Sequence, residues 1–141
     1  MKAPTLDLPA DGGGRVSLQA LNGPAVVYFY PKDDTAGCTR EAQDFTALAP
    51  EFAALGVTVI GVSKDTVAKH ERFKAKHGLD VVLASDEDGA ACEAWGVWVE
   101  KTLYGRKYMG IERATFLVDA DGMIRRAWRK LSVKGHEQEQ L

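Results

Sequence analysis

Two short apolar runs, Ala25–Tyr30 and Val57–Val62, are the strongest strand signals in the chain. Such runs are typical of strands that a sheet buries on both faces. Between them, apolar residues recur at helical spacing at Ala42, Phe45, Leu48, Ala49, Phe52 and Leu55. Pro50 predicts a kink or a second short helix, and Gly56 predicts its end. The order of strand, helix and strand predicts a βαβ unit with a right-handed crossover.

The segments on either side of this unit carry clear breaker residues. Short alternating pieces at 5–8 and 15–18 surround a glycine-rich turn and predict an N-terminal hairpin or an irregular lead-in. After the second strand, Ser63 or Asp65 is expected to cap a helix that ends at Gly78. This helix would give the sheet a second covering element.

The C-terminal half continues with shorter elements. Asp119-Ala120-Asp121-Gly122 is a strong hairpin turn signal, whereas the polar and aromatic stretch 98–109 is left without an assigned element. The expected elements are a strand at 81–83, a helix at 89–95, hairpin strands at 114–118 and 123–128, and a last helix starting near Val133. This order predicts one α/β domain over residues 1–141. It would have a thioredoxin-like fold, a mixed central sheet flanked by helices and an N-terminal hairpin extension.

Composition narrows the class of protein. The chain of 141 residues is 45% hydrophobic and 27% charged, as expected for one soluble globular domain. A net charge of -2 gives no electrostatic case for nucleic acid or for an anionic membrane. The apolar runs are far shorter than the ~18 residues that cross a bilayer, and Met1-Lys2-Ala3-Pro4 lacks an apolar signal core. We therefore expect a cytoplasmic protein.

The cysteine and histidine content gives no metal or disulfide pattern. The two cysteines form neither a disulfide framework nor a C-x-x-C pair, which favours a reducing compartment. His70, His77 and His136 have no cysteine or histidine neighbours at metal-ligand spacing, so no metal is expected.

Cys38 follows the first buried strand, where a polar turn leads into a helix. A helix start has unpartnered N–H groups and a partial positive charge, so it favours a thiolate over a thiol. Gly37 has no Cβ and would let a small substrate approach closely, and Thr35 can direct its hydroxyl at the sulfur or at an oxygen bound there. Pro31 fixes the backbone as it leaves the strand. Together these residues predict a reactive cysteine.

The pattern P-x-x-x-T-x-x-C, formed by Pro31, Thr35 and Cys38, resembles the active-site signature of the peroxiredoxins, the AhpC/TSA family. The longer stretch 30–42 looks like the bacterioferritin comigratory protein or peroxiredoxin Q branch. Other segments similar to that branch follow in the same order at Gly61–Asp65, Ser85–Gly89, Tyr104–Arg106 and Gly110–Phe116. The resemblance covers nearly the whole chain. It implies a thioredoxin-like fold and a thiol-dependent peroxidase that needs no cofactor.

The implied reaction is attack of the Cys38 thiolate on hydrogen peroxide or an organic hydroperoxide, which leaves a sulfenic acid. Donors aimed at the leaving oxygen would lower the barrier. The candidates are the Thr35 hydroxyl, the Gly37 and Cys38 N–H groups, and Arg113. By the resemblance, Arg113 stands beside the reactive sulfur and Glu41 orients its guanidinium.

Each role has a structural alternative. Thr35 could act only as a helix N-cap, and Arg113 could be a surface charge at a strand end. Glu41 could simply be an acidic residue in the first turn that interacts favourably with the helix dipole. The negative charges of Asp33 and Asp34 disfavour a thiolate, and the positive charge of Lys32 offsets this effect in part.

A second, resolving cysteine is absent from the positions that relatives use, which are Gln43 and the region of Phe73 and Lys74 here. Cys92 remains as the internal candidate, but its apolar neighbours predict a buried, inert thiol. The sulfenic acid would then wait for thioredoxin, glutaredoxin or a small thiol. A redox sensor or holdase chaperone that uses the same cysteine is the alternative function. The chain is expected to be a monomer or a weak homodimer.

Overall fold

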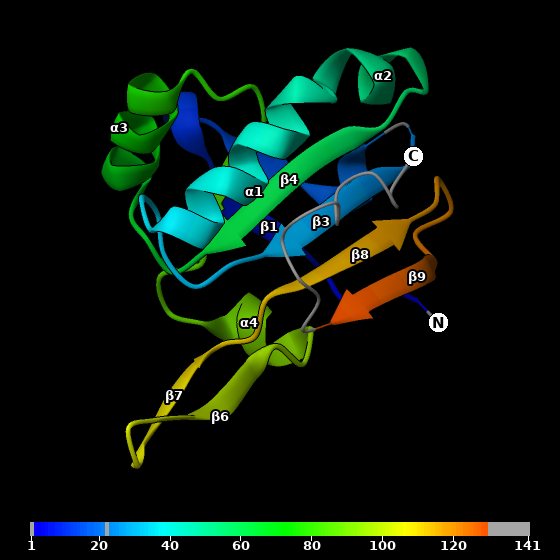
Figure 1. Ribbon diagram of the computed structural model, residues 1–141. Helices are drawn as coiled ribbons and strands as arrows, with labels where there is room; N and C mark the ends of the chain where they lie inside the picture. Colours follow the sequence, from blue (N-terminus) through cyan, green and yellow to red (C-terminus); the bar gives the residue numbers. More distant parts are fainter. Residues whose placement is uncertain (1, 22, 130–141) are drawn as a thin grey trace.

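The computed structural model describes residues 2–21 and 23–129, and its centre is a mixed sheet of five strands in the order β5-β4-β3-β8-β9 (Figure 1). The strands are β3 (Ala25–Phe29), β4 (Thr58–Ser63), β5 (Val82–Ser85), β8 (Ala114–Val118) and β9 (Ile124–Arg129). β3, β4 and β5 are parallel, while β8 and β9 run antiparallel to their neighbours. The predicted βαβ unit and the C-terminal hairpin are both confirmed.

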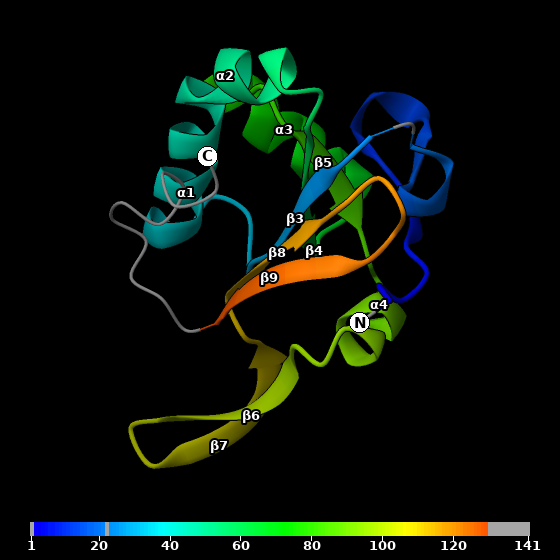
Figure 2. The same ribbon diagram turned by 90° about the vertical axis from the view of Figure 1, so that its right-hand side faces the viewer.

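Helices cover the two faces of this sheet unequally. α1 (Ala36–Ala47), α2 (Ala49–Ala54) and α3 (Val67–His77) lie on one side, and α4 (Ala90–Ala94) lies on the other with the N-terminal segment (Figures 1 and 2). Pro50 stands in the first turn of α2, so the expected second short helix is confirmed.

The alternation of side chains along β3 divides the core into two clusters. Val26 and Tyr28 pack with Cys38 and Phe45 of α1 and with Phe73 of α3. The opposite face is built from Ala25, Val27 and Phe29 with Cys92, Trp95 and the N-terminal Leu6 and Val16. The two cysteines therefore belong to cores on opposite sides of the sheet.

Two hairpins lie outside the central sheet. β1 (Asp7–Pro9) pairs with β2 (Arg15–Ser17), which confirms the N-terminal hairpin. β6 (Trp98–Leu103) and β7 (Arg106–Ile111) form a second hairpin, which extends away from the sheet in both views (Figures 1 and 2). Tyr104 and Gly105 make its two-residue turn, both with positive φ (51° and 77°). Asn-Gly or Asp-Gly is the usual signal for such a turn, and Tyr104-Gly105 carries only the glycine of that signal.

The start of α3 differs from the expectation. The N-cap is Thr66, whose side chain accepts a hydrogen bond of 3.2 Å from the Lys69 N–H, and the prediction of Ser63 or Asp65 is wrong. Ser63 and Asp65 are instead bonded to each other, because the Ser63 hydroxyl donates to the Asp65 carboxylate. Gly78 ends α3 in the left-handed conformation, as predicted. The last helix expected near Val133 lies outside the described residues.

Gly61 of β4 faces the ring of Tyr28, and a Cβ built there would lie 2.6 Å from the Tyr28 Cζ. Tyr28 is fully buried and cannot move away freely. We expect Gly61→Ala to lower the free energy of unfolding by about 1 to 3 kcal/mol, as overpacking does. Urea denaturation would measure it, with Gly14→Ala as the control, since nothing lies within 4 Å of a Cβ at Gly14. Equal midpoints for the two variants would contradict the prediction.

Candidate active site

Cys38 is the third residue of α1, directly after the loop that leaves the central strand β3. The first helical hydrogen bond runs from the Thr39 N–H to the Thr35 carbonyl over 2.8 Å. The N–H groups of Gly37 and Cys38 therefore have no helical acceptor and point toward the region before the helix. Because the helix dipole adds partial positive charge there, this position favours negative charge on the sulfur.

Arg113 joins the sulfur to a buried carboxylate. Its Nη2 donates to the Cys38 Sγ over 3.1 Å, and its Nη1 donates to the Glu41 Oε1 over 2.7 Å. Cys38 is 1% exposed and Glu41 0% exposed. Glu41 follows Cys38 by three residues, so both side chains lie on one face of α1. The guanidinium of Arg113 is therefore held between the Cys38 sulfur and the Glu41 carboxylate, and its positive charge stabilises negative charge on both.

The sheet explains how residues so far apart in sequence meet. Phe29, the last residue of β3, pairs with Ala114, the first residue of β8. Arg113 precedes Ala114, so it lies beside the point where the chain leaves β3 for α1. The antiparallel register thus delivers the guanidinium to the start of the helix.

Charges and burial in the site favour a charged arginine and a neutral tyrosine. Burial alone would lower the pKa of Arg113, but the carboxylate of Glu41 and the sulfur of Cys38 outweigh it and raise that pKa. Burial, and then the negative charges of Glu41 and Cys38, raise the pKa of Tyr28 well above its usual value. Tyr28 therefore stays protonated beneath the site.

Three residues that precede the sulfur in the chain occupy defined places. Thr35 stands at the N-cap of α1, but its hydroxyl donates to the Lys32 carbonyl over 2.9 Å and makes no bond to the helix. A Cβ at Gly37 would lie 3.3 Å from the Arg113 Nη2, so the missing side chain makes room for the guanidinium. Pro31 is exposed in the turn after β3.

The two acidic residues before the cysteine are turned away from it, toward α3. Asp33 bonds to the Nδ1 of His70 over 2.6 Å, and Asp34 bonds to Lys76 and His77, each over 2.8 Å. The hydrogen bonds from Lys76 and His77 lower the pKa of Asp34. The sequence suggested that the negative charges of Asp33 and Asp34 would oppose a thiolate. In the structure both carboxylates are instead bonded to side chains of α3.

His70 and Asp33 are the residues that sequence reasoning missed as parts of the site. The available signal was that His70 and Phe73 are three residues apart, which places both on one face of α3. That face packs onto the sheet, so a histidine on it has to be satisfied by buried partners.

Cys92 lies in α4, in the core on the far side of the sheet from Cys38. It is 0% exposed, and its main-chain N–H donates to Asp86 over 2.8 Å. Burial, and then the hydrogen bond and charge of Asp86, raise the pKa of the Cys92 thiol. This environment disfavours the thiolate that disulfide chemistry needs.

An open cleft of about 540 Å³ reaches Arg113 from the β6–β7 hairpin. Its lining residues are Val99, Glu100, Lys101, Thr102, Tyr108, Glu112 and Arg113. Burial, followed by repulsion from Arg113, lowers the pKa of Lys101. Arg113, whose side chain is 19% exposed, is thus partly open to solvent.

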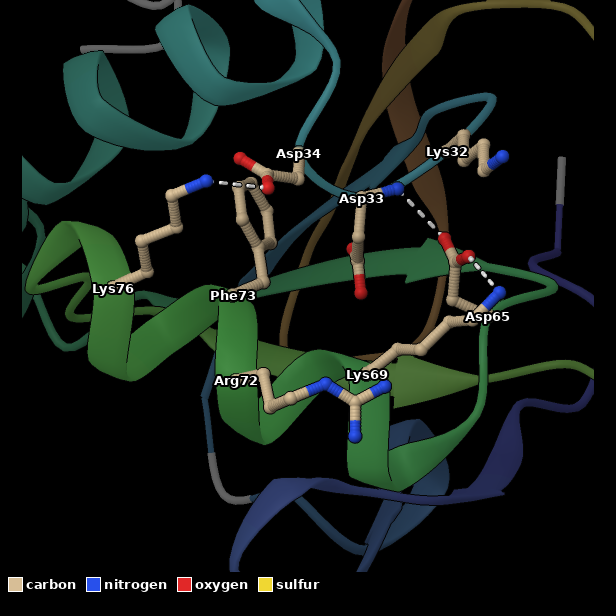
Figure 3. Close-up of a pocket in the computed structure, with 8 residues that line it drawn as sticks. All are labelled: Lys32, Asp33, Asp34, Asp65, Lys69, Arg72, Phe73 and Lys76. Carbon is tan, nitrogen blue, oxygen red and sulfur yellow. Dashed lines mark hydrogen bonds and ion pairs between the residues drawn. The ribbon is translucent and has the colours of Figure 1, made fainter.

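A second pocket of about 320 Å³ lies between residues 32–34 and α3 (Figure 3). Among residues 2–21 and 23–129, no group of three or more histidine, cysteine, aspartate or glutamate side chains is arranged to hold a metal ion. Within the same residues, no helix is long and apolar enough to cross a membrane.

Comparison with known proteins matches residues 1–127 to the model of the AhpC/TSA family. Peroxiredoxin Bcp of Bacillus subtilis is 48% identical, over 99% of this chain and 90% of the relative. A solved bacterioferritin comigratory protein of Xanthomonas campestris, described for its alkyl peroxide reduction activity, has a TM-score of 0.90 at 46% identity. That match covers 96% of this chain and 87% of the other.

A PrxQ of Xylella fastidiosa has a TM-score of 0.92 at 39% identity, with 99% of this chain and 92% of the other covered. These structures confirm the predicted thioredoxin-like fold. The family resemblance inferred from the motifs is confirmed as well, because three kinds of comparison agree over nearly the full length. The chain therefore belongs to the AhpC/TSA family and is a peroxiredoxin, a thiol-dependent peroxidase that takes a peroxide as substrate and a thiol as reductant.

Proposed function

We propose that Cys38 is the peroxide-reactive residue and that it reduces hydrogen peroxide and organic hydroperoxides through a sulfenic acid. The observation that carries the proposal is the 3.1 Å bond from Arg113 to the Cys38 sulfur at the start of a helix. A guanidinium and free N–H groups stabilise the thiolate before reaction and growing charge on oxygen during it. The activity described for the Xanthomonas campestris relative supports alkyl hydroperoxides as substrates.

In the proposed step the thiolate attacks the terminal oxygen of the hydroperoxide. An S–O bond forms as the O–O bond breaks, and the proton on the attacked oxygen stays there to give the sulfenic acid. The leaving oxygen departs with the electron pair and takes a proton from water, which yields water or an alcohol. The sulfur is oxidised and the peroxide is reduced, so the step needs no cofactor.

Each neighbour of the sulfur has a role in this step. Arg113 and the N–H groups of Gly37 and Cys38 donate to the peroxide oxygens, and Glu41 holds the guanidinium in place. The Thr35 hydroxyl donates its hydrogen bond to the Lys32 carbonyl, so its oxygen can accept a hydrogen bond from the O–H of the peroxide. We assign Pro31 the role of shaping the turn.

The sulfenic acid then needs an outside thiol. One thiol displaces water to form a mixed disulfide at Cys38, and a second thiol releases the cysteine. Thioredoxin, glutaredoxin and small thiols are the candidate donors, which fits a reducing compartment such as the cytoplasm. Measuring peroxide consumption with each donor in turn tests the proposal. Failure of every donor to support repeated turnover would refute it.

We expect Cys92→Ser to keep nearly full turnover with an external thiol, because Cys92 lies across the sheet from Cys38. After one equivalent of peroxide, peptide mass analysis should find one oxygen added at Cys38 and no internal disulfide. Excess peroxide should carry Cys38 on to the sulfinic acid.

The opposite outcome for Cys92 is equally measurable. A disulfide needs the two Cα atoms within about 7 Å, so the helices carrying them would have to unwind. A rapid, nearly complete Cys38–Cys92 disulfide that is absent in Cys92→Ser would show that Cys92 resolves the sulfenic acid.

A further inference from the structure

The loop of residues 31–35, called here the active-site loop, is held against α3 by a buried polar cluster. The Asp33 carboxylate accepts from the Tyr30 hydroxyl over 2.5 Å and contacts the His70 Nδ1 over 2.6 Å. The His70 Nε2 lies 3.0 Å from the Ala84 carbonyl of β5, and His70 is 0% exposed. The reaction described above makes no use of these groups.

The partners of His70 determine how the cluster is bonded. The Ala84 carbonyl can only accept, so the Nε2 of His70 carries a hydrogen. One further proton lies between the Asp33 carboxylate and the Nδ1, whichever atom carries it. Asp33 and His70 are thus bonded to each other in a mostly buried site, with His70 0% and Asp33 8% exposed, where a satisfied network is rigid.

The main chain of the active-site loop is tied down as well. The Asp33 N–H donates to the Asp65 carboxylate over 2.7 Å, as Figure 3 shows, and the same oxygen accepts from Ser63. The next residue, Asp34, has a φ of 61°, in the left-handed region that residues other than glycine seldom adopt. Both the main chain and the side chain of Asp33 are therefore held by hydrogen bonds directly before the left-handed residue Asp34.

The turn leads directly to the reacting groups. Asp34 is followed by Thr35 at the N-cap of α1, and Cys38 is the third residue of that helix. Figure 3 shows Asp33 and Asp34 facing α3 across the pocket, with the Asp34–Lys76 bond on the same helix. The direction of the Thr35 oxygen and of the free N–H groups therefore depends on where Asp33 is anchored.

We propose that Asp33 and His70 are positioning residues for peroxide reduction, which fix the active-site loop so that Thr35 and the start of α1 meet the peroxide in reacting geometry. The inference rests on the proposed role of Cys38. Neither residue bonds to the sulfur or to Arg113, so the pair acts on where the peroxide lies. The thiolate itself is held by contacts that the pair leaves in place.

The test compares two reactions of the same sulfur in Asp33→Ala, His70→Leu and the double variant. Stopped flow gives the rate of Cys38 oxidation by hydrogen peroxide, and peptide mass analysis gives its alkylation by iodoacetamide. Alkylation needs the thiolate and access but not the peroxide-binding geometry. We expect the ratio of the oxidation rate to the alkylation rate to fall about 10- to 100-fold, the scale of a small misplacement.

The double variant should lose no more than the worse single variant, because the two residues act as a unit. Tyr30→Phe removes only the hydroxyl bonded to Asp33 and keeps the packing, so it serves if a larger change fails to fold. It should lower the ratio in the same direction, by less. An unchanged ratio in the folded variants would overturn the proposal.

Lys74→Met is the matched control. Lys74 is also on α3, but its Nζ bonds to Asp11 over 2.6 Å and not to a residue of the active-site loop. This variant should lose stability but keep the wild-type ratio, and an equal fall in its ratio would refute a specific role for the pair. Should peroxide leave wild-type Cys38 unmodified, the proposed function fails, and the positioning proposal falls with it.

Discussion

Cys38→Ser is expected to abolish peroxide reduction and to leave the fold intact. The serine hydroxyl is close in size to the thiol, so the buried position beside Arg113 remains filled. A hydroxyl is not ionised near neutral pH, however, and the neutral group is a poor nucleophile toward a peroxide. Peroxide consumption with an excess of thiol reductant would drop to the rate without protein, while circular dichroism stays unchanged.

The control for this experiment is Cys92→Ser, which makes the same chemical change in the other core. If the two cysteines were interchangeable, both variants would lose activity together. Substantial turnover by Cys38→Ser would remove the basis for assigning the chemistry to Cys38. Fast, repeated turnover by the wild type also separates a peroxidase from a sensor or holdase, which needs only one oxidation event.

Local sequence signals were sufficient for most of the fold. The two apolar runs became β3 and β4, and Pro50 and Gly78 stand where a helix begins and another ends. The β6–β7 hairpin was missed because its strands mix polar and apolar residues without regular alternation and its turn is Tyr104-Gly105. A hairpin that leaves the core carries no strong alternation of apolar and polar residues, so periodicity gives little signal there.

The place of Cys38 at the start of a helix after the first buried strand could be predicted because the signature around it is local. The pairing of Asp33 with His70 could not, since it joins a loop to a helix 37 residues later in the chain. Only the crossover from β4 through α3 brings them together. In the same way, the face on which Cys92 packs depends on where α4 lies relative to the sheet, which its own sequence does not determine.

Arg113→Ala is expected to slow the oxidation of Cys38 by the equivalent of about 2 to 4 kcal/mol of transition-state stabilisation, the scale of one lost oxyanion donor. The guanidinium is the one side chain bonded to both the sulfur and Glu41 among the residues that the structure describes. Before the reaction, the loss of the guanidinium removes the positive charge beside the Cys38 thiolate. During the reaction, it removes a hydrogen-bond donor to the peroxide oxygens. Single-turnover stopped flow measures the rate.

This variant also removes the ion pair between Arg113 and the buried Glu41 carboxylate, and breaking a buried ion pair should destabilise the fold by about 3 to 5 kcal/mol. The double variant Arg113→Ala/Glu41→Gln separates the two effects, because a neutral amide no longer needs a cation. We expect it to recover much of the stability and none of the rate.

Arg113→Lys completes the series. It keeps the charge, but its single ammonium lacks the fork that reaches the sulfur and the carboxylate together, so an intermediate rate is expected. A rate for Arg113→Ala within a few-fold of wild type would make Arg113 a structural residue. Recovery of the full rate by the double variant would show that the negative charge of Glu41, rather than the missing guanidinium, had slowed the reaction.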